Sequence, residues 1–243
     1  MKVYSACDIG LVRPENQDHL ITEKFDDGFL VIVCDGMGGM EKGAEASRIA
    51  VNAALETFRA KYKAEMTSDA ICELLRDATN EANQAVYEEA VKGEMRIRMG
   101  TTLVGAYVRE DLACLVNVGD SRAYLIETEG EAKQLTLDHT VVQMLYERGD
   151  ITAEERMTHP RRNELTRAVG VTARVLSDSY ELQLLPHDRL LFCSDGLYSL
   201  VPTDKMAEIV RSHPLEEVPQ ALVAEANAQG GKDNISVIVL AKD

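Results

Sequence analysis

The fold of this chain is decided by residues 30–39, which have the sequence LVIVCDGMGG. Five consecutive apolar residues predict a strand that is buried on both faces, and the glycines that follow predict a tight turn. Asp35 lies at the junction, where the buried strand reaches the surface. Because burying a carboxylate costs several kcal/mol unless it is paired, Asp35 needs a positively charged partner.

Four other aspartates, Asp18, Asp120, Asp195 and Asp233, also lie beside strand-like runs. Taken singly, most can be explained as turn residues, since Asp-Gly and Gly-Asp-Ser are common turn sequences. Repetition favours a shared site, because Asp-Gly follows an apolar strand at both Asp35 and Asp195. Few basic residues lie nearby, and the candidates are Lys232, Arg122 and the distant Arg13. Hard divalent cations are therefore the expected partners of these carboxylates.

Composition limits the classes of partner. With 243 residues and a formal net charge of −15, the chain does not favour nucleic acids or anionic membranes, which select for basic surfaces. Residues 1–8 lack the apolar core of a signal peptide, and no run approaches the roughly 20 apolar residues of a membrane span. No linker or fixed-period repeat divides the sequence. We expect one cytoplasmic domain over residues 1–243, acting as a monomer.

The cysteines form an odd set of five with no C-x-x-C pair, and four of them lie in apolar segments. They are Cys7, Cys34, Cys72, Cys114 and Cys193. This pattern favours reduced thiols in the core. A zinc site or a nucleophilic cysteine is disfavoured, because soft-ligand sites usually use closely spaced cysteines and histidines.

Hydrophobic periodicity predicts the architecture. Helical spacing of apolar residues predicts two long amphipathic helices, at 46–58 and 71–86, and a last helix from about Glu216 to Ala228. Strands are predicted at 102–108, 112–118, 122–126, 182–185, 189–193 and 235–240. Because most of these runs are apolar throughout, both faces of each sheet should be covered. We therefore expect an α+β fold, a four-layer αββα sandwich with two central, mostly antiparallel β-sheets flanked by helices.

The segment from about 140 to 173 differs from the rest of the chain. It is polar, it is rich in arginine, and helical patterning is confined to Val141–Tyr146. We expect one helix followed by a mobile flap. Arg161 and Arg162 could bind acidic or phosphorylated residues beside a substrate site, or they could be solvated loop residues.

A series of motifs runs in order along nearly the whole sequence. It comprises DIG at 8–10, Arg13, ENQD at 15–18, CDGMGG at 34–39, MGTTL at 99–103, NVGDSRAY at 117–124, LTLDH at 135–139, HPRRN at 159–163, LTRAVG at 165–170, CSDGL at 193–197 and GKDNI at 231–235. This series closely resembles the metal-dependent serine/threonine protein phosphatases, the PPM or type 2C family, in its compact bacterial form.

The resemblance implies a binuclear site for Mn²⁺ or Mg²⁺ at the edge of the sandwich. By motif position, Asp35 bridges the two ions and the Gly36 carbonyl binds one of them. Asp195 and Asp233 are similar to the family's ligands of the second ion. Oxygen ligands suit both metals, so the choice between manganese and magnesium stays open.

Three more residues have roles that the resemblance implies. Asp18 is similar to the acid that holds a metal-bound water without touching the metal. Asp120 is similar to the ligand of a weaker third metal in bacterial members. Arg13, by itself an ordinary exposed arginine, would clamp the phosphate, because guanidinium offers paired donors matched to a dianion.

The resemblance also implies the reaction: water activated by two metal ions attacks phosphorus in line, and no cysteine or serine nucleophile is needed. The chain departs from many eukaryotic relatives at Met37, where they have a histidine proposed to protonate the leaving group. Some bacterial members have a histidine where this chain has Met40. A thioether cannot donate a proton, so the donor stays open between metal-bound water, which we prefer, and His159, which could instead only cap or pack the flap.

We therefore expect a metal-dependent protein phosphatase that hydrolyses phosphoserine and phosphothreonine in phosphorylated proteins and opposes a bacterial Ser/Thr kinase. Two alternatives stay open. One is a pseudophosphatase that binds phosphoproteins without turnover, which the intact Asp35, Asp195 and Asp233 disfavour. The other is a phosphohydrolase that acts on small molecules.

Overall fold

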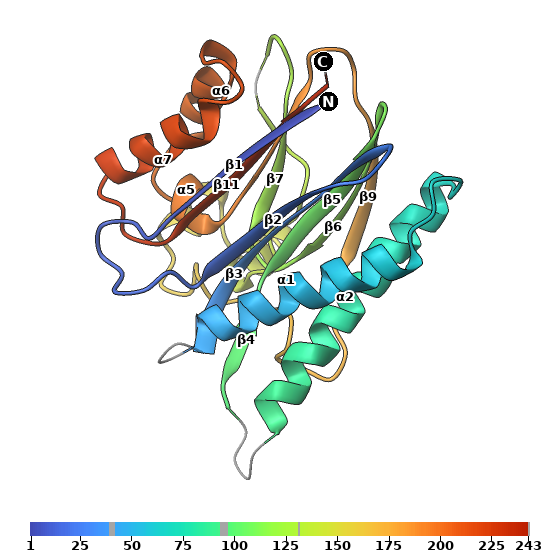
Figure 1. The fold of residues 1–243 in the computed structure, drawn as a ribbon. Helices are drawn as coiled ribbons and strands as arrows, with labels where there is room; N and C mark the ends of the chain where they lie inside the picture. The colour runs from blue at the N-terminus through green and yellow to red at the C-terminus, as the bar shows by residue number, and fades with distance from the viewer. Residues whose placement is uncertain (39–41, 93–96, 131, 243) are drawn as a thin grey trace.

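The computed structural model describes residues 1–38, 42–92, 97–130 and 132–242, and these form two central antiparallel sheets (Figure 1). The first sheet contains, in spatial order, β1 (Lys2–Asp8), β11 (Ile235–Ala241), β10 (Arg189–Cys193), β7 (Arg122–Ile126) and β8 (Lys133–Gln134). The second contains β2 (Asp18–Lys24), β3 (Gly28–Gly38), β5 (Leu103–Arg109), β6 (Leu112–Val118) and β9 (Asp178–Gln183), and β4 (Met99–Thr101) pairs with β3. Since β1 pairs with β11, the two ends of the chain lie together.

Helices cover the outer face of each sheet (Figure 1). The long helices α1 (Lys42–Lys61) and α2 (Ser68–Val91) pack on the second sheet, and the shorter α5 (Asp195–Tyr198), α6 (Thr203–Ser212) and α7 (Val218–Ala228) pack on the first. Two more helices, α3 (Val141–Glu147) and α4 (Ala153–Thr158), lie in the connection between β8 and β9. No helix in the described ranges combines the length and apolar character that a membrane crossing requires.

The layers follow from the alternation of side chains along apolar strands. In β3, Leu30, Ile32 and Cys34 face the helices, whereas Val31 and Val33 face the other sheet, and all five are buried. The other central strands divide their side chains in the same way. Three apolar cores result, one between the sheets and one under each helical layer. The predicted four-layer αββα sandwich with antiparallel sheets is confirmed.

The differences from the sequence prediction lie mainly at the sheet edges. Strands β1, β2, β4 and β8 and helix α6 were not predicted, and β9 begins at Asp178 rather than at Leu182. The segment predicted to hold one helix and then a flap holds two, because Thr152 and Glu155 form a capping box that starts α4. Gly39 and Met40 lie outside the described residues.

Candidate metal centre

Four of the five predicted carboxylates line one cavity of about 1180 Å³, together with Arg13 and Gly36. The four are Asp35, Asp120, Asp195 and Asp233. Asp35 lies near the end of β3, Asp120 between β6 and β7, Asp195 at the start of α5 directly after β10, and Asp233 just before β11. Antiparallel pairing brings these strand ends to the same edge of the sandwich. The structure therefore joins the residues that the motif series had marked separately.

The backbone of Asp35 is held by two threonines. Its N–H donates to Thr102 Oγ1 at 2.9 Å, and its carbonyl accepts from Thr101 Oγ1 at 2.8 Å and from the Thr102 N–H at 2.9 Å. Thr102 Oγ1 also lies 2.7 Å from Ser121 Oγ, next to Asp120. These hydrogen bonds fix the backbone from which the Asp35 carboxylate projects.

Residue 36 must be glycine because two neighbouring backbone segments approach it too closely for a side chain to fit. A Cβ there would lie 2.1 Å from the Gly43 carbonyl oxygen and 2.5 Å from that of Gln17. The Gly36 N–H donates to the same Gln17 oxygen at 3.1 Å. The sequence predicted a tight turn directly after Asp35, but β3 continues to Gly38 because its last residues pair with β4. The close contact at Gly36 holds this end of β3 against both the start of α1 and the residue that precedes Asp18.

Asp18 lies beneath the cavity, opposite Asp35 in the β2–β3 register, and is only 4% exposed. Its Oδ2 accepts from Ser194 Oγ at 2.7 Å. Its Oδ1 is buried and has no hydrogen-bond partner among the described residues. A buried carboxylate oxygen without a donor is costly, so this atom calls for a water molecule or a cation beside it.

Burial and mutual repulsion raise the pKa values of the cluster. Burial, and then the charge of Asp18, raise the pKa of Asp35 well above its ordinary value. Burial is also the main cause for Asp18, whose pKa is raised to about 7, for Asp195, raised to about 6, and for Asp120, raised to about 8. The charge of Asp233 adds to the rise at Asp195. Cations bound among these groups would favour their charged forms.

One arginine pairs directly with a carboxylate of the cluster. Arg13 Nη2 donates to Asp233 Oδ2 at 2.6 Å, and its side chain stays 53% exposed at the cavity. Arg122, which the sequence offered as another partner, instead makes a two-pronged ion pair with Asp138 at 2.9 and 2.6 Å, and it stacks on Tyr198. The sequence prediction that basic residues are scarce at the carboxylates agrees with this arrangement.

Asn234 and Ser194 organise the site, although no role was predicted for either of them from the sequence. Asn234 Nδ2 donates to the carbonyls of Ile9 at 2.9 Å and Glu15 at 3.0 Å, and its Oδ1 accepts from the Gln17 N–H at 2.8 Å. It thereby ties the loop that carries Arg13 to the turn that carries Asp233. Both residues belong to motifs that the sequence singled out, but their contacts reach segments at the other end of the chain.

The connection between β8 and β9 forms one wall of the cavity through residues 163–168. Arg162 and Lys232 line a smaller adjoining cavity of about 190 Å³ that also reaches Asp195 and Asp233. Arg161 is paired with Glu164 through contacts of 2.6 and 2.8 Å. His159 is not among the described residues that line either cavity, and its Nδ1 accepts the Arg161 N–H at 3.1 Å. The local capping role fits His159 better than proton donation.

The donors fit a hard divalent cation. The cavity presents carboxylate and carbonyl oxygens, and neither cysteine nor histidine is among the described residues that line it. Mg²⁺ and Mn²⁺ prefer such oxygen ligands, whereas zinc favours sulfur and nitrogen. The orphaned Asp18 oxygen and the raised pKa values point to the same conclusion.

Comparison with known proteins agrees with the fold and the site. The family model described as Protein phosphatase 2C matches residues 14–228. The serine/threonine phosphatase stp of Listeria monocytogenes is 38% identical over 239 residues, which are 97% of this chain and 94% of that protein. The solved serine/threonine phosphatase Stp1 from Staphylococcus aureus has a TM-score of 0.92 at 32% identity, covering 100% of this chain and 95% of that one.

A further solved structure bears on the metal. It is the catalytic domain of the serine threonine protein phosphatase PstP in complex with two manganese ions, with a TM-score of 0.82 and 30% identity, covering 98% of this chain and 96% of that one. Its fold is shared over almost the full length described above. The chain belongs to the protein phosphatase 2C, or PPM, family of bacterial serine/threonine phosphatases.

Proposed function

We propose that this serine/threonine phosphatase is metal-dependent and hydrolyses phosphoserine and phosphothreonine in proteins by direct attack of water on phosphorus. Two divalent cations, Mn²⁺ or Mg²⁺, would be held by Asp35, the Gly36 carbonyl, Asp195 and Asp233. Asp120 would hold a weaker third ion. When bound, these ions would lower the pKa of water and neutralise the phosphoryl oxygens.

The observation that carries the proposal is the cluster of carboxylates at one cavity with too little positive charge around it. Among the described residues, Arg13 forms an ion pair with Asp233 of the cluster, whereas Arg122 is paired with Asp138 instead. Phosphate monoesters are dianions and are inert, so hydrolysis requires charge compensation that the side chains alone do not supply. An anionic substrate would otherwise be repelled by this cavity.

The chain's own residues would orient the reactants. Asp18 has one carboxylate oxygen committed to Ser194 and the other free, so it can accept a hydrogen bond from the attacking water and fix its direction. Arg13 is exposed and lies at the cavity, where its guanidinium can turn from Asp233 to the phosphate oxygens once Asp233 is compensated. Met37 lines the cavity but cannot donate a proton, so we propose that water rather than a side chain protonates the leaving alkoxide.

The shape of the site supports a protein substrate. The main cavity is open enough for a side chain presented by a protein, and Arg162 and Lys232 line the smaller cavity beside it. These cations could bind acidic or phosphorylated residues next to the scissile group. We propose a bacterial Ser/Thr kinase and its targets as the phosphorylated partners.

The cysteines of the described chain are free thiols, which supports a reducing, cytoplasmic location. We propose that residues 1–243 form one domain.

Phosphate release from a phosphothreonine peptide tests the proposal. Turnover is expected with Mn²⁺ or Mg²⁺, and it should stop with chelator and in Asp195→Asn. An aryl phosphate and a set of phosphorylated metabolites, assayed in parallel, test the alternative of a small-molecule phosphohydrolase. Folded protein that binds the phosphopeptide but does not turn it over with either ion would favour the pseudophosphatase instead.

A further inference from the structure

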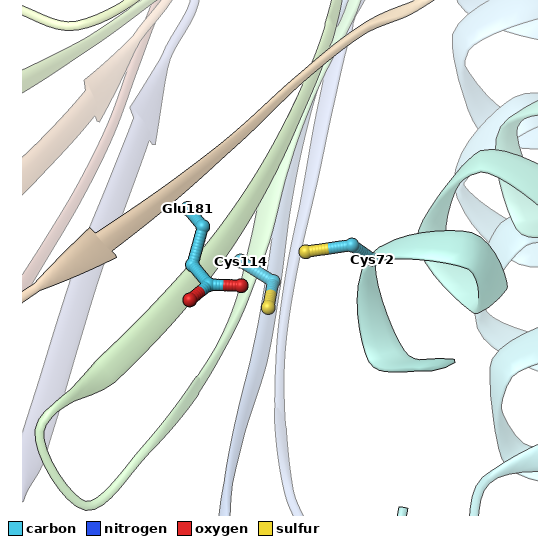
Figure 2. Close-up of side chains that lie close together, drawn as sticks. All are labelled: Cys72, Cys114 and Glu181. Atoms are coloured by element: carbon cyan, nitrogen blue, oxygen red, sulfur yellow. The ribbon is translucent and has the colours of Figure 1, made fainter. Parts of the chain in front are cut away.

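Three side chains far apart in the sequence meet between helix α2 and the second sheet. Cys72 lies in the first part of α2, Cys114 in β6 and Glu181 in β9. One ligand atom from each lies within 4.8 Å of the other two. Figure 2 shows the two sulfur atoms and the Glu181 carboxylate converging from the helix and the sheet. None of the three is among the described residues lining either cavity of the carboxylate centre.

The backbone holds two of these ligands in place. Cys114 and Glu181 are direct partners in the antiparallel β6–β9 register, so their side chains leave the same face of the sheet. Helix α2 packs on that face and supplies Cys72. The group is therefore positioned by two strands and a long helix rather than by a loop.

We propose that Cys72, Cys114 and Glu181 form a binding site for a thiophilic divalent cation, with Zn²⁺ as the natural occupant. Zinc binds both thiolates and carboxylates, and a site with three protein ligands can take water in the fourth position. Sulfur atoms that share a tetrahedral zinc at about 2.3 Å each lie about 3.8 Å apart, which this group can reach with small adjustments. The sequence argument against zinc relied on spacing along the chain, whereas these ligands come from separate elements.

The two thiols of the site are buried, whereas the exposed Glu181 leaves a path by which a metal ion can enter from solvent. Cys114 is fully buried and Cys72 is 8% exposed, whereas Glu181 is exposed and leaves a side open to solvent. The Cys114 thiol lies 3.6 Å from the Ser68 carbonyl, to which it can donate its proton. On metal binding both thiols would release their protons to solvent and become thiolates. Because Mn²⁺ and Mg²⁺ prefer oxygen ligands, they would bind at the carboxylate centre, and the softer Zn²⁺ would bind at the thiol site.

The expected consequence is a cross-link between α2 and the β6–β9 edge of the second sheet. Metal that binds only the folded chain stabilises it by mass action. Zinc should therefore raise the unfolding temperature without any need for the carboxylate centre, and the rise should disappear when either thiol is removed.

Cadmium is a suitable probe, because sulfur-to-metal charge transfer gives an ultraviolet band that oxygen-bound metal does not give. The chain is stripped of metal, kept reduced, and titrated with Cd²⁺ while excess Mn²⁺ occupies the carboxylate centre. The band should saturate at about one equivalent of Cd²⁺ per chain. It should be lost in Cys72→Ala and in Cys114→Ala, and Glu181→Gln should weaken the affinity by about tenfold or more.

Matched controls keep the test interpretable. Cys7→Ala removes an exposed thiol at another place and should leave the band unchanged. Glu181→Gln changes an exposed side chain, so its effect does not depend on whether the buried Cys114→Ala variant folds. Circular dichroism verifies folding of each variant.

Three results would overturn the proposal. One is the absence of the band in the reduced wild type, and another is its survival in both thiol variants. The third is a purified protein with two fewer titratable thiols and a mass lower by two hydrogens, both reversed by reductant and absent from the thiol variants. That result would identify the pair as a disulfide rather than a metal site.

Discussion

Replacing Asp195 with asparagine should stabilise the metal-free protein even though it removes a proposed metal ligand. Burial and the charge of Asp233 raise the pKa of Asp195 from 3.8 to about 6. The folded chain therefore disfavours the charged form of this side chain. Asparagine has nearly the same shape but no charge, so the substitution removes the repulsion and keeps the packing.

The magnitude follows from proton linkage. A pKa raised by about two corresponds to roughly 3 kcal/mol of stability lost when the Asp195 carboxyl is fully charged. Solvent screens part of this cost because Asp195 is half-buried, so we expect Asp195→Asn to gain about 1–2 kcal/mol at pH 8. Below about pH 4 the Asp195 carboxyl is protonated in the folded and unfolded chain alike, so it costs no stability. The cost develops as the pH rises through about 6, where the folded chain loses this proton. The advantage of the variant should therefore vanish toward pH 4.

Urea unfolding in chelator, measured from pH 4 to pH 8, gives this difference directly. Asp204→Asn is a matched control, because Asp204 is exposed in the first turn of α6, where its loss should cost about 0.3–1 kcal/mol. With saturating Mn²⁺ the order should reverse, and wild type should be the more stable. If Asp195→Asn were less stable than wild type in chelator at pH 8, or if the difference did not change with pH, the reasoning would be refuted.

Other substitutions test the parts that position the centre. Gly36→Ala should destabilise the fold by about 1–3 kcal/mol in urea unfolding and abolish turnover, because the added Cβ would overlap the Gly43 carbonyl. Wild-type stability in this variant would contradict the close approach of the two segments. Thr102→Val should cost about 1–3 kcal/mol, because the Asp35 N–H loses its side-chain acceptor, and Thr102→Ser should recover most of it. Arg13→Ala should lower kcat/KM for a phosphopeptide by about ten- to a hundredfold, the worth of hydrogen bonds to a charged group, and an unchanged value would exclude the phosphate clamp.

The sequence predicted the strands in the middle of each sheet better than those at the edges. β7 and β10 have the predicted limits, since both of their faces are covered and the apolar runs are continuous. The strands at the sheet edges, β1, β2, β8 and β9, were missed or misplaced. Their outer residues meet solvent, so they contain polar side chains and lack the apolar signal. Strand β4 was also missed, because its three residues are too few to show a strand pattern even though all are buried.

The carboxylates could be predicted because each lies in or beside the end of a strand and belongs to a motif. The residues that support them could not be assigned roles in the same way. Ser194 reaches Asp18, and Asn234 reaches the loop before β2, through pairings set by the order of strands in the sheets. The meeting of Cys72, Cys114 and Glu181 depends on the same tertiary register, and spacing along the chain gave no sign of it.

Mn²⁺ binding and turnover, measured on the same samples, test whether Asp35, Asp195 and Asp233 hold the ions that make hydrolysis possible. Electron paramagnetic resonance of free Mn²⁺ should show about two tightly bound ions per wild-type chain, and fewer in Asp195→Asn and Asp233→Asn, with phosphopeptide turnover falling in step. Full turnover in chelated protein, or unchanged Mn²⁺ binding in variants that have lost activity, would contradict the claim.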